Sequence, residues 1–140
     1  MKVRKAMAKT ISTAGPNDTV ARAAELMKIE DCGFIPVVAE DKVVGVVTDR
    51  DIVIRCLAHG HADVLTETID HVMTRGVWTI DVDAPIEAAA HEMAAHEVRR
   101  LPVMEKDRLV GVLSFGNLEQ ALHAKGPAAA EATLGITHGA

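Results

Sequence analysis

The stretch Val43-Val44-Gly45-Val46-Val47-Thr48-Asp49-Arg50-Asp51 has a counterpart 66 residues later, Leu109-Val110-Gly111-Val112-Leu113-Ser114-Phe115-Gly116-Asn117. Each copy is a short apolar run interrupted by glycine, followed by a hydroxyl residue and, three positions later, by Asp or Asn. Short apolar runs predict strands, and a hydroxyl residue after such a run is typical of a helix start. We therefore expect two equivalent strand-to-helix corners, around which the rest of the chain is organised.

The duplication extends over most of the chain. Residues 7–56 align with residues 73–122 without a gap, and about eleven aligned positions are identical. Two copies are too few for a solenoid, which needs at least three units to bury its core. We expect repeats at 1–60 and 69–125, joined by a linker at 61–68, to face one another about a pseudo-two-fold axis and bury a shared sheet surface.

Each repeat predicts the element order β-α-β-β-α, so the fold class is α+β, with two sheets packed together and the helices outside. Asp18 is the expected N-cap of the first long helix, and Pro85 is expected at the first position of its counterpart. The first repeat should hold a strand at 11–13, a helix at 19–30, a hairpin of 34–39 and 42–47, and a helix at 49–57. The second should hold a hairpin of 101–105 and 108–113 and a final helix at 115–124. The Ala- and Gly-rich tail, 126–140, is expected to be flexible or a loose helix.

Composition excludes several classes of function. A formal net charge of -5 argues against nucleic-acid binding, because basic side chains supply most of that affinity. No apolar run reaches the roughly 18 residues of a membrane span. The start of the chain has no apolar signal segment, and the two cysteines, Cys32 and Cys56, suit a reducing compartment. A cytoplasmic protein without a required disulfide is expected.

The order of features in each copy resembles the CBS (cystathionine-beta-synthase) domain: a Met, a short strand, an Ala-rich helix ending in Met, an apolar-Pro-Val strand, an acidic turn and the apolar-Gly-apolar-Thr-x-x-Asp corner. Two such copies in tandem resemble the Bateman module, and the resemblance covers about residues 3–124. It implies a regulatory fold that binds AMP, ADP, ATP, S-adenosylmethionine or sometimes NAD between its repeats. It also implies no enzymatic activity and no required cofactor, with an adenine nucleotide as a regulatory ligand.

In the family, the hydroxyl-x-x-Asp corner of one repeat works with the first-strand segment and the basic residues before the Pro of the other. The resemblance thus implies one strong cleft, formed by Thr48, Asp51, Val77, Thr79, Arg99 and Arg100. Because the chain has few aromatic residues, we expect backbone groups and aliphatic walls such as Ile35, Val77 and Leu101 to hold the base. A weaker cleft would hold Ile11, Thr13, Ser114 and Asn117. The second corner is weaker because Asn is neutral and offers one carbonyl oxygen in place of two charged ones.

Two of these assignments have a purely structural alternative. Thr48-x-x-Asp51 is also the pattern of a capping box, in which the two side chains satisfy backbone N–H groups at a helix start. A carboxylate at that place can still accept the hydroxyls of a ribose, so the two interpretations are compatible. Arg99 and Arg100 are either a solvated pair near a helix end or a phosphate contact, for which the planar guanidinium is suited. The first repeat has Gly33 and Phe34 at the equivalent positions.

Cys56, His59 and His61 form a Cys-x-x-His-x-His pattern at the expected end of a helix. The simpler interpretation is a partly buried Cys beside two loop histidines, because no fourth ligand is nearby in the sequence. A metal site completed across an oligomer is the alternative.

The sequence contains none of the common catalytic motifs for phosphate transfer, acyl transfer or zinc hydrolysis. We therefore expect a signal-transduction module that senses an adenosine-containing ligand and acts on a protein partner. Apolar helix faces and the small size of each repeat predict a homodimer. The alternative function is a ligand-free structural or interaction protein, or a metal-binding stress protein.

Overall fold

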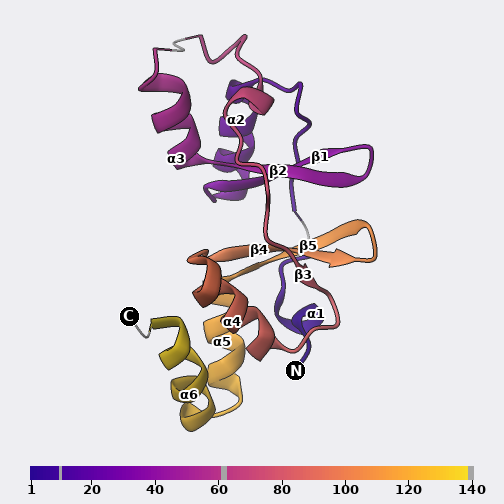
Figure 1. The fold of residues 1–140 in the computed structure, drawn as a ribbon, viewed down its shortest axis with the longest axis vertical. Helices are drawn as coiled ribbons and strands as arrows, with labels where there is room; N and C mark the ends of the chain where they lie inside the picture. Colours follow the sequence, from indigo (N-terminus) through magenta and orange to yellow (C-terminus); the bar gives the residue numbers. More distant parts are fainter. Residues whose placement is uncertain (10, 61–62, 139–140) are drawn as a thin grey trace. The chain divides into compact units, whose positions relative to one another are not determined.

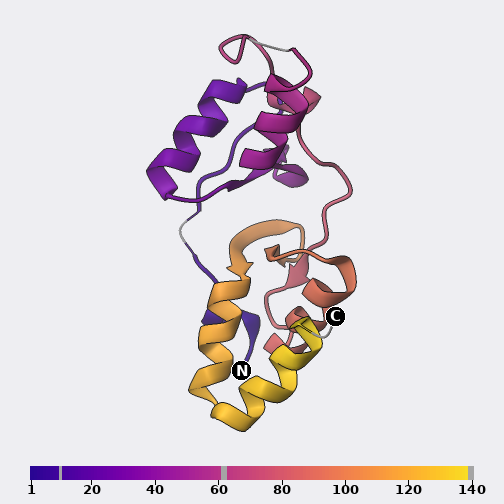
Figure 2. The ribbon, with the colours of Figure 1, turned by 90° about the vertical axis from the view of Figure 1, so that its left-hand side faces the viewer.

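The computed structural model describes residues 1–9, 11–60 and 63–138. The chain folds as two compact units, drawn in Figures 1 and 2. Ile11–Val77 form the first-repeat unit, and Met1–Thr10 together with Trp78–Ala140 form the second-repeat unit. Each repeat in the sequence therefore gives its leading segment to the other unit, so the compact units differ from the expected repeats at 1–60 and 69–125.

The first-repeat unit is built on a hairpin. Strands β1 (Phe34–Ala39) and β2 (Lys42–Thr48) pair antiparallel, with Phe34 opposite Thr48. Helices α2 (Val20–Glu30) and α3 (Asp49–Asp51), the latter continued by the π-helix η1 (Ile52–Leu57), lie on one face of this hairpin (Figures 1 and 2). The short 3-10 helix η2 (Ile69–His71) closes the unit. The core between the helices and the hairpin includes Val20, Ala23, Met27, Ile35, Val37, Val47, Cys56 and Ile69.

A crossing segment, residues 72–76, runs from η2 over strand β2. Val46 and Thr74 exchange two backbone hydrogen bonds, at 3.0 and 2.8 Å between nitrogen and oxygen. Gly45 permits this close approach, because a Cβ atom at that position would lie 2.7 Å from the Thr74 carbonyl oxygen and 2.8 Å from the Met73 sulfur. The glycine that interrupts each apolar run thus marks the place where another backbone lies against the strand.

The second-repeat unit repeats this plan with additions. Strands β4 (Arg100–Glu105) and β5 (Arg108–Ser114) form the hairpin, and β3 (Ile80–Asp81) pairs parallel with β4. Helices α4 (Ile86–His96) and α5 (Phe115–Ala124) cover one face of the sheet, and α6 (Pro127–His138) packs on these two helices (Figure 1). The N-terminal helix α1 (Val3–Ala6) is part of the second-repeat unit. Ala8 exchanges two backbone hydrogen bonds with Val112 of β5, as Thr74 does with Val46 of β2.

The hairpins and both strand-to-helix corners were predicted correctly, whereas three details of the prediction were wrong. Residues 11–13 form no strand, and only Ala14 makes an isolated bridge to Val37. The N-cap of α2 is Thr19, whose side chain accepts from the Arg22 N–H, while Asp18 accepts from the Gly15 N–H. Pro85 is the N-cap of α4, since its ψ of 149° is extended and helical geometry begins one residue later.

The tail, which we expected to be flexible or a loose helix, forms a packed helix where the structure describes it. Residues 127–138 form helix α6, and the side chains of Ala130 and Leu134 are buried in the same core as α4 and α5. The reason is that Ala130 and Leu134 are one helical turn apart and so share one face of the helix. Among the described residues, none of the helices has the length and apolar character needed to cross a membrane.

Candidate functional site

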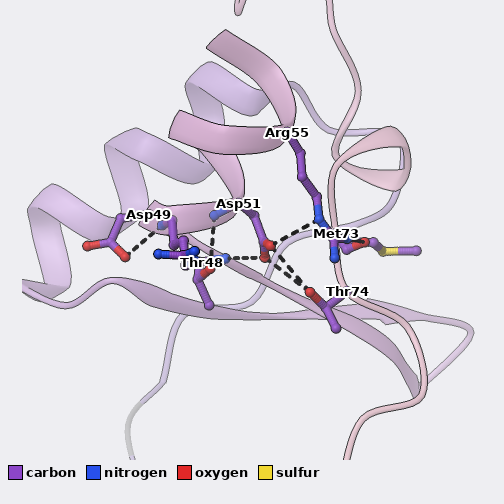
Figure 3. A network of polar contacts seen from close by, with 7 residues as sticks. Thr48, Asp49, Asp51, Arg55, Met73 and Thr74 are labelled. Carbon is purple, nitrogen blue, oxygen red and sulfur yellow. Dashed lines mark hydrogen bonds and ion pairs between the residues drawn. The ribbon is translucent and has the colours of Figure 1, made fainter. Parts of the chain in front are cut away.

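The candidate site begins at the corner where β2 ends and α3 begins (Figure 3). The Thr48 side chain accepts a hydrogen bond from the Asp51 N–H at 3.1 Å, and the Asp51 carboxylate accepts one from the Thr48 N–H at 3.0 Å. This reciprocal pair is a capping box, so the structural interpretation of the Thr48-x-x-Asp51 pattern is confirmed. It fixes the Asp51 carboxylate at the first turn, where the backbone dipoles favour a negative charge.

Asp51 is only 7% exposed and is the one charged residue that is buried among residues 1–9, 11–60 and 63–134. Two side chains outside the Thr48-x-x-Asp51 pattern contact the Asp51 carboxylate. The Thr74 hydroxyl lies 3.3 and 3.4 Å from the two carboxylate oxygens, and Arg55 Nε lies 3.6 Å from Asp51 Oδ1. Arg55 also donates through Nη1 to the Met73 carbonyl at 3.1 Å, which joins the crossing segment to the helix (Figure 3). A buried carboxylate thus has partners that offset its loss of water.

The second-repeat unit has the same corner without the charge. Ser114 and Asn117 form a capping box, at 3.0 Å from the Asn117 N–H to the Ser114 hydroxyl and 3.2 Å for the reciprocal bond. The basic pair lies beside this corner, because Arg100 is paired with Ser114 across the hairpin and the Arg99 carbonyl accepts from the Phe115 N–H at 2.7 Å.

The two arginines of this pair have different surroundings. The Arg99 guanidinium lies over the Phe115 ring, 4.3 Å from its centroid, in a cation–π contact. The Arg100 side chain is exposed and makes no hydrogen bond or ion pair with any residue that the structure describes. Arg100 is therefore the more available of the two for an anionic ligand. The predicted grouping of these arginines with Asp51 joins residues of two different units and stays a prediction.

The remaining predicted ligand contacts divide by burial. Ile35 and Leu101, the expected aliphatic walls, are 1% and 0% exposed and belong to the cores of their own units, which favours a structural role. The segments before the long helices are more accessible. Val77 and Ile11 are partly buried, and Thr13 and Thr79 are exposed.

The structure gives little support to the metal candidates that it describes. The Cys56 side chain is buried in the core of the first-repeat unit, and burial raises the pKa of its thiol, with a smaller contribution from the nearby Glu67 charge. A raised pKa disfavours the thiolate that binds metals. His59 is exposed, and His61 lies outside the described residues. Within the part of the chain that the structure describes, no three His, Cys, Asp or Glu side chains are grouped so that they could hold a metal ion.

Three residues of interest were not predicted from the sequence. Arg55 and Thr74 were not predicted at the Asp51 corner, although the spacing of four between Asp51 and Arg55 on a helix is a signal for the first. Trp78, which is 50% exposed, stacks on His96 with the ring centroids 3.5 Å apart and an interplanar angle of 5°. No local sequence pattern predicts that contact, because the two residues are joined only through the fold of the unit.

Two α+β repeats, each with a capped strand-to-helix corner, are the architecture of a CBS domain pair. The family model for the CBS domain matches residues 3–57 and 69–124. The chain therefore belongs to the CBS domain family, which confirms the resemblance inferred from the sequence.

Relatives and solved structures agree with this assignment. CBS domain-containing protein YhcV of Bacillus subtilis is 35% identical over 116 residues, which are 83% of this chain and 81% of YhcV. The crystal structure of Hypoxic Response Protein I with two coordinated zinc ions has a TM-score of 0.79 at 32% identity, covering 87% of this chain and 99% of that one. The CBS domain pair of protein MJ0100, in complex with 5-methylthioadenosine and S-adenosyl-L-methionine, has a TM-score of 0.78 at 28% identity, covering 89% and 98% of the two chains.

Proposed function

We propose that this CBS domain pair is a cytoplasmic regulatory module that binds an adenosine-containing ligand, namely AMP, ADP, ATP or S-adenosylmethionine, and has no catalytic activity of its own. The main support for this proposal is the position of Asp51, whose buried carboxylate is held at a helix start beside the Thr48 hydroxyl. A carboxylate accepts hydrogen bonds from both hydroxyls of a ribose, which is the group these ligands share. The MJ0100 pair, solved with two adenosine derivatives, supports this ligand class.

The binding affinity for the ligand should depend on Asp51 more than on Asn117. A hydrogen bond to a charged group contributes on the order of 1.5–3 kcal/mol, about twice that of a neutral one. Arg100 supports the same proposal as an exposed guanidinium suited to a phosphate. In the family arrangement inferred from the sequence it contacts the ligand together with Asp51, and Arg100→Ala should then weaken ATP and AMP binding but leave adenosine binding nearly unchanged.

Titration calorimetry with AMP, ADP, ATP and S-adenosylmethionine on nucleotide-free protein tests the proposal. Binding of at least one of them, with a matching rise in melting temperature, is the expected result, because a ligand that binds only the folded state stabilises it. No heat and no thermal shift at millimolar concentration with any of the four would refute the proposed function.

A metal-binding role is the second candidate, and the zinc-containing structure of Hypoxic Response Protein I favours it. Zinc would have to involve residues in addition to Cys56 and His59, since the described residues hold no cluster of three ligands. Elemental analysis of protein purified without added metal separates the two candidates. Near one zinc ion per chain, retained after dialysis, would support the second.

We also propose that the module acts as a homodimer. Val53, Ile54 and Leu57 of η1 are 53%, 44% and 51% exposed, an unusual exposure for three apolar side chains on one short helix. An open surface depression of about 350 Å³ lies where α3 meets η1, lined by Asp49, Arg50, Val53 and Ile54. Ile54→Asp should convert the dimer into a monomer in light scattering, whereas Leu65→Asp, at an exposed leucine outside η1, should not. A wild-type monomer at micromolar concentration would contradict the proposal.

A further inference from the structure

The Asp51 carboxylate already has three neighbours in the first-repeat unit (Figure 3). Oδ2 accepts from the Thr48 N–H at 3.0 Å, and the Thr74 hydroxyl spans both oxygens at 3.3 and 3.4 Å. Arg55 Nε faces Oδ1 at 3.6 Å. A carboxylate offers about four lone-pair directions, so the two hydrogen-bond donors leave about two, and the Arg55 cation stands in front of Oδ1 at ion-pair distance.

A ribose diol would need both of the remaining directions, although the Arg55 guanidinium already lies beside Oδ1. Its two hydroxyl groups would each donate to the carboxylate, and together they require at least two acceptor directions. The Thr48 N–H belongs to the capping box and cannot leave without opening the helix start. The groups that can give way are the Thr74 hydroxyl, at long hydrogen-bond distance, and the half-exposed Arg55 side chain.

The second corner shows that these two groups are not needed to shape the site. At an offset of 66 residues, Ala121 stands where Arg55 does, and Ala8 stands where Thr74 does. The Ser114 and Asn117 capping box nevertheless forms with the same two bonds. Arg55 and Thr74 are therefore present at the corner with the charged Asp51. At the corner with the neutral Asn117, alanine occupies both equivalent positions.

We propose that Arg55 and Thr74 set the ligand affinity of the Asp51 corner by competing with the ribose diol for its carboxylate. The inference rests on the proposed function. In the ligand-free protein, Arg55 bridges Asp51 and the Met73 carbonyl. When a diol binds, the Arg55 guanidinium and the Thr74 hydroxyl lose their contacts with the Asp51 carboxylate and are hydrated by water instead.

A double variant, Arg55→Ala with Thr74→Ala, tests the proposal. It places alanine at the two positions of the first corner that are already alanine at the second corner. Calorimetry with AMP should show binding about 10-fold tighter than wild type, because the diol no longer displaces a charge-assisted contact. Arg50→Ala is the matched control, since it removes the same charge from the residue next to Asp51, and the Arg50 side chain forms no hydrogen bond or ion pair with the Asp51 carboxylate. Loss of a cation by itself should weaken the binding of anionic AMP, so tightening has the opposite sign to a simple charge effect.

The 2′,3′-dideoxy analogue of AMP separates competition from a structural effect. The gain should disappear with this analogue, which has no diol. Tighter AMP binding by the double variant, or binding by the variant when wild type shows none, supports the proposal if the gain depends on the diol. Equal or weaker AMP binding, or a gain that persists with the dideoxy analogue, overturns it while the proposed function stands. If neither protein binds AMP or the other three ligands, the proposed function fails together with this inference. Arg55→Gln, with an expected gain in the same direction, replaces the double variant if that variant does not fold.

Discussion

Gly45→Ala should destabilise the first-repeat unit through a contact that no local sequence pattern describes. The added Cβ would lie 2.7 Å from the Thr74 carbonyl oxygen and 2.8 Å from the Met73 sulfur. Real Cβ contacts are longer than this, so either the crossing segment or strand β2 must move. The methionine side chain can rotate away, but the Thr74 carbonyl is held by its hydrogen bond from the Val46 N–H at 3.0 Å.

The structure gives two estimates of the cost. If the crossing segment moves away, the two backbone bonds between Val46 and Thr74 are lost or lengthened, at about 0.5–1.5 kcal/mol each. If the segment stays, the unit accepts the extra methyl group as overpacking strain, which costs about 1–3 kcal/mol. Both routes predict a loss of about 1–3 kcal/mol, and the first would also displace Thr74 from Asp51.

Urea denaturation followed by far-ultraviolet circular dichroism measures this loss. Gly116→Ala is the matched control, because a Cβ there would meet only the Ser114 hydroxyl oxygen at an ordinary 3.7 Å. The control should leave stability unchanged or raise it by up to about 1 kcal/mol, since Gly is a poor helix former. A Gly45→Ala protein within about 0.5 kcal/mol of wild type would refute the reasoning that the crossing segment is closely packed on β2.

Two further predictions concern the tail and the pH dependence. Leu134→Ala should cost about 2 kcal/mol in chemical denaturation, because its side chain is buried in the core shared with α4 and α5, and an unchanged midpoint would mean that α6 contributes nothing to the core. The hydrogen bond from His71 to Glu67, together with the Asp70 charge, raises the pKa of His71. The contact between His71 and Glu67 therefore stabilises the protein fully below the unfolded pKa of about 6.5, and this stabilisation is lost as the pH rises through the folded pKa. In thermal unfolding, the small advantage of wild type over His71→Gln should shrink from about pH 6 to about pH 8.5, and an advantage that grows with pH would contradict the assignment.

Local patterns were enough to predict much of this fold. The hairpins and the two capping boxes depend on residues within a few positions of one another, and the 66-residue offset reinforced each assignment. The N-caps at Thr19 and Pro85 were each misplaced by one position, since neighbouring residues such as Asp18 have similar capping preferences.

The rest of the fold and site depends on contacts between distant segments. The crossing segment lies on β2, and the N-terminal residues join the second-repeat unit, for reasons that only the packed chain reveals. Thr74 reaches Asp51 because that segment brings it there, 23 residues away in the sequence. Asp51 itself could be predicted as a candidate site, but its partners could not.

Calorimetry of Asp51→Asn beside Asn117→Ala, with the best-binding adenosine ligand, decides which of the two corners binds the ribose. Asp51→Asn keeps an acceptor for the Thr48 N–H and removes only the charge, and circular dichroism checks that both variants are folded. Asp51→Asn should weaken binding about 10- to 100-fold, as expected for the loss of a charge-assisted hydrogen bond. Asn117→Ala should change the affinity less than about 3-fold, because its bond to a ligand would be neutral and weak. Abolished binding in Asn117→Ala with full affinity in Asp51→Asn would contradict the claim and move the site to the second corner.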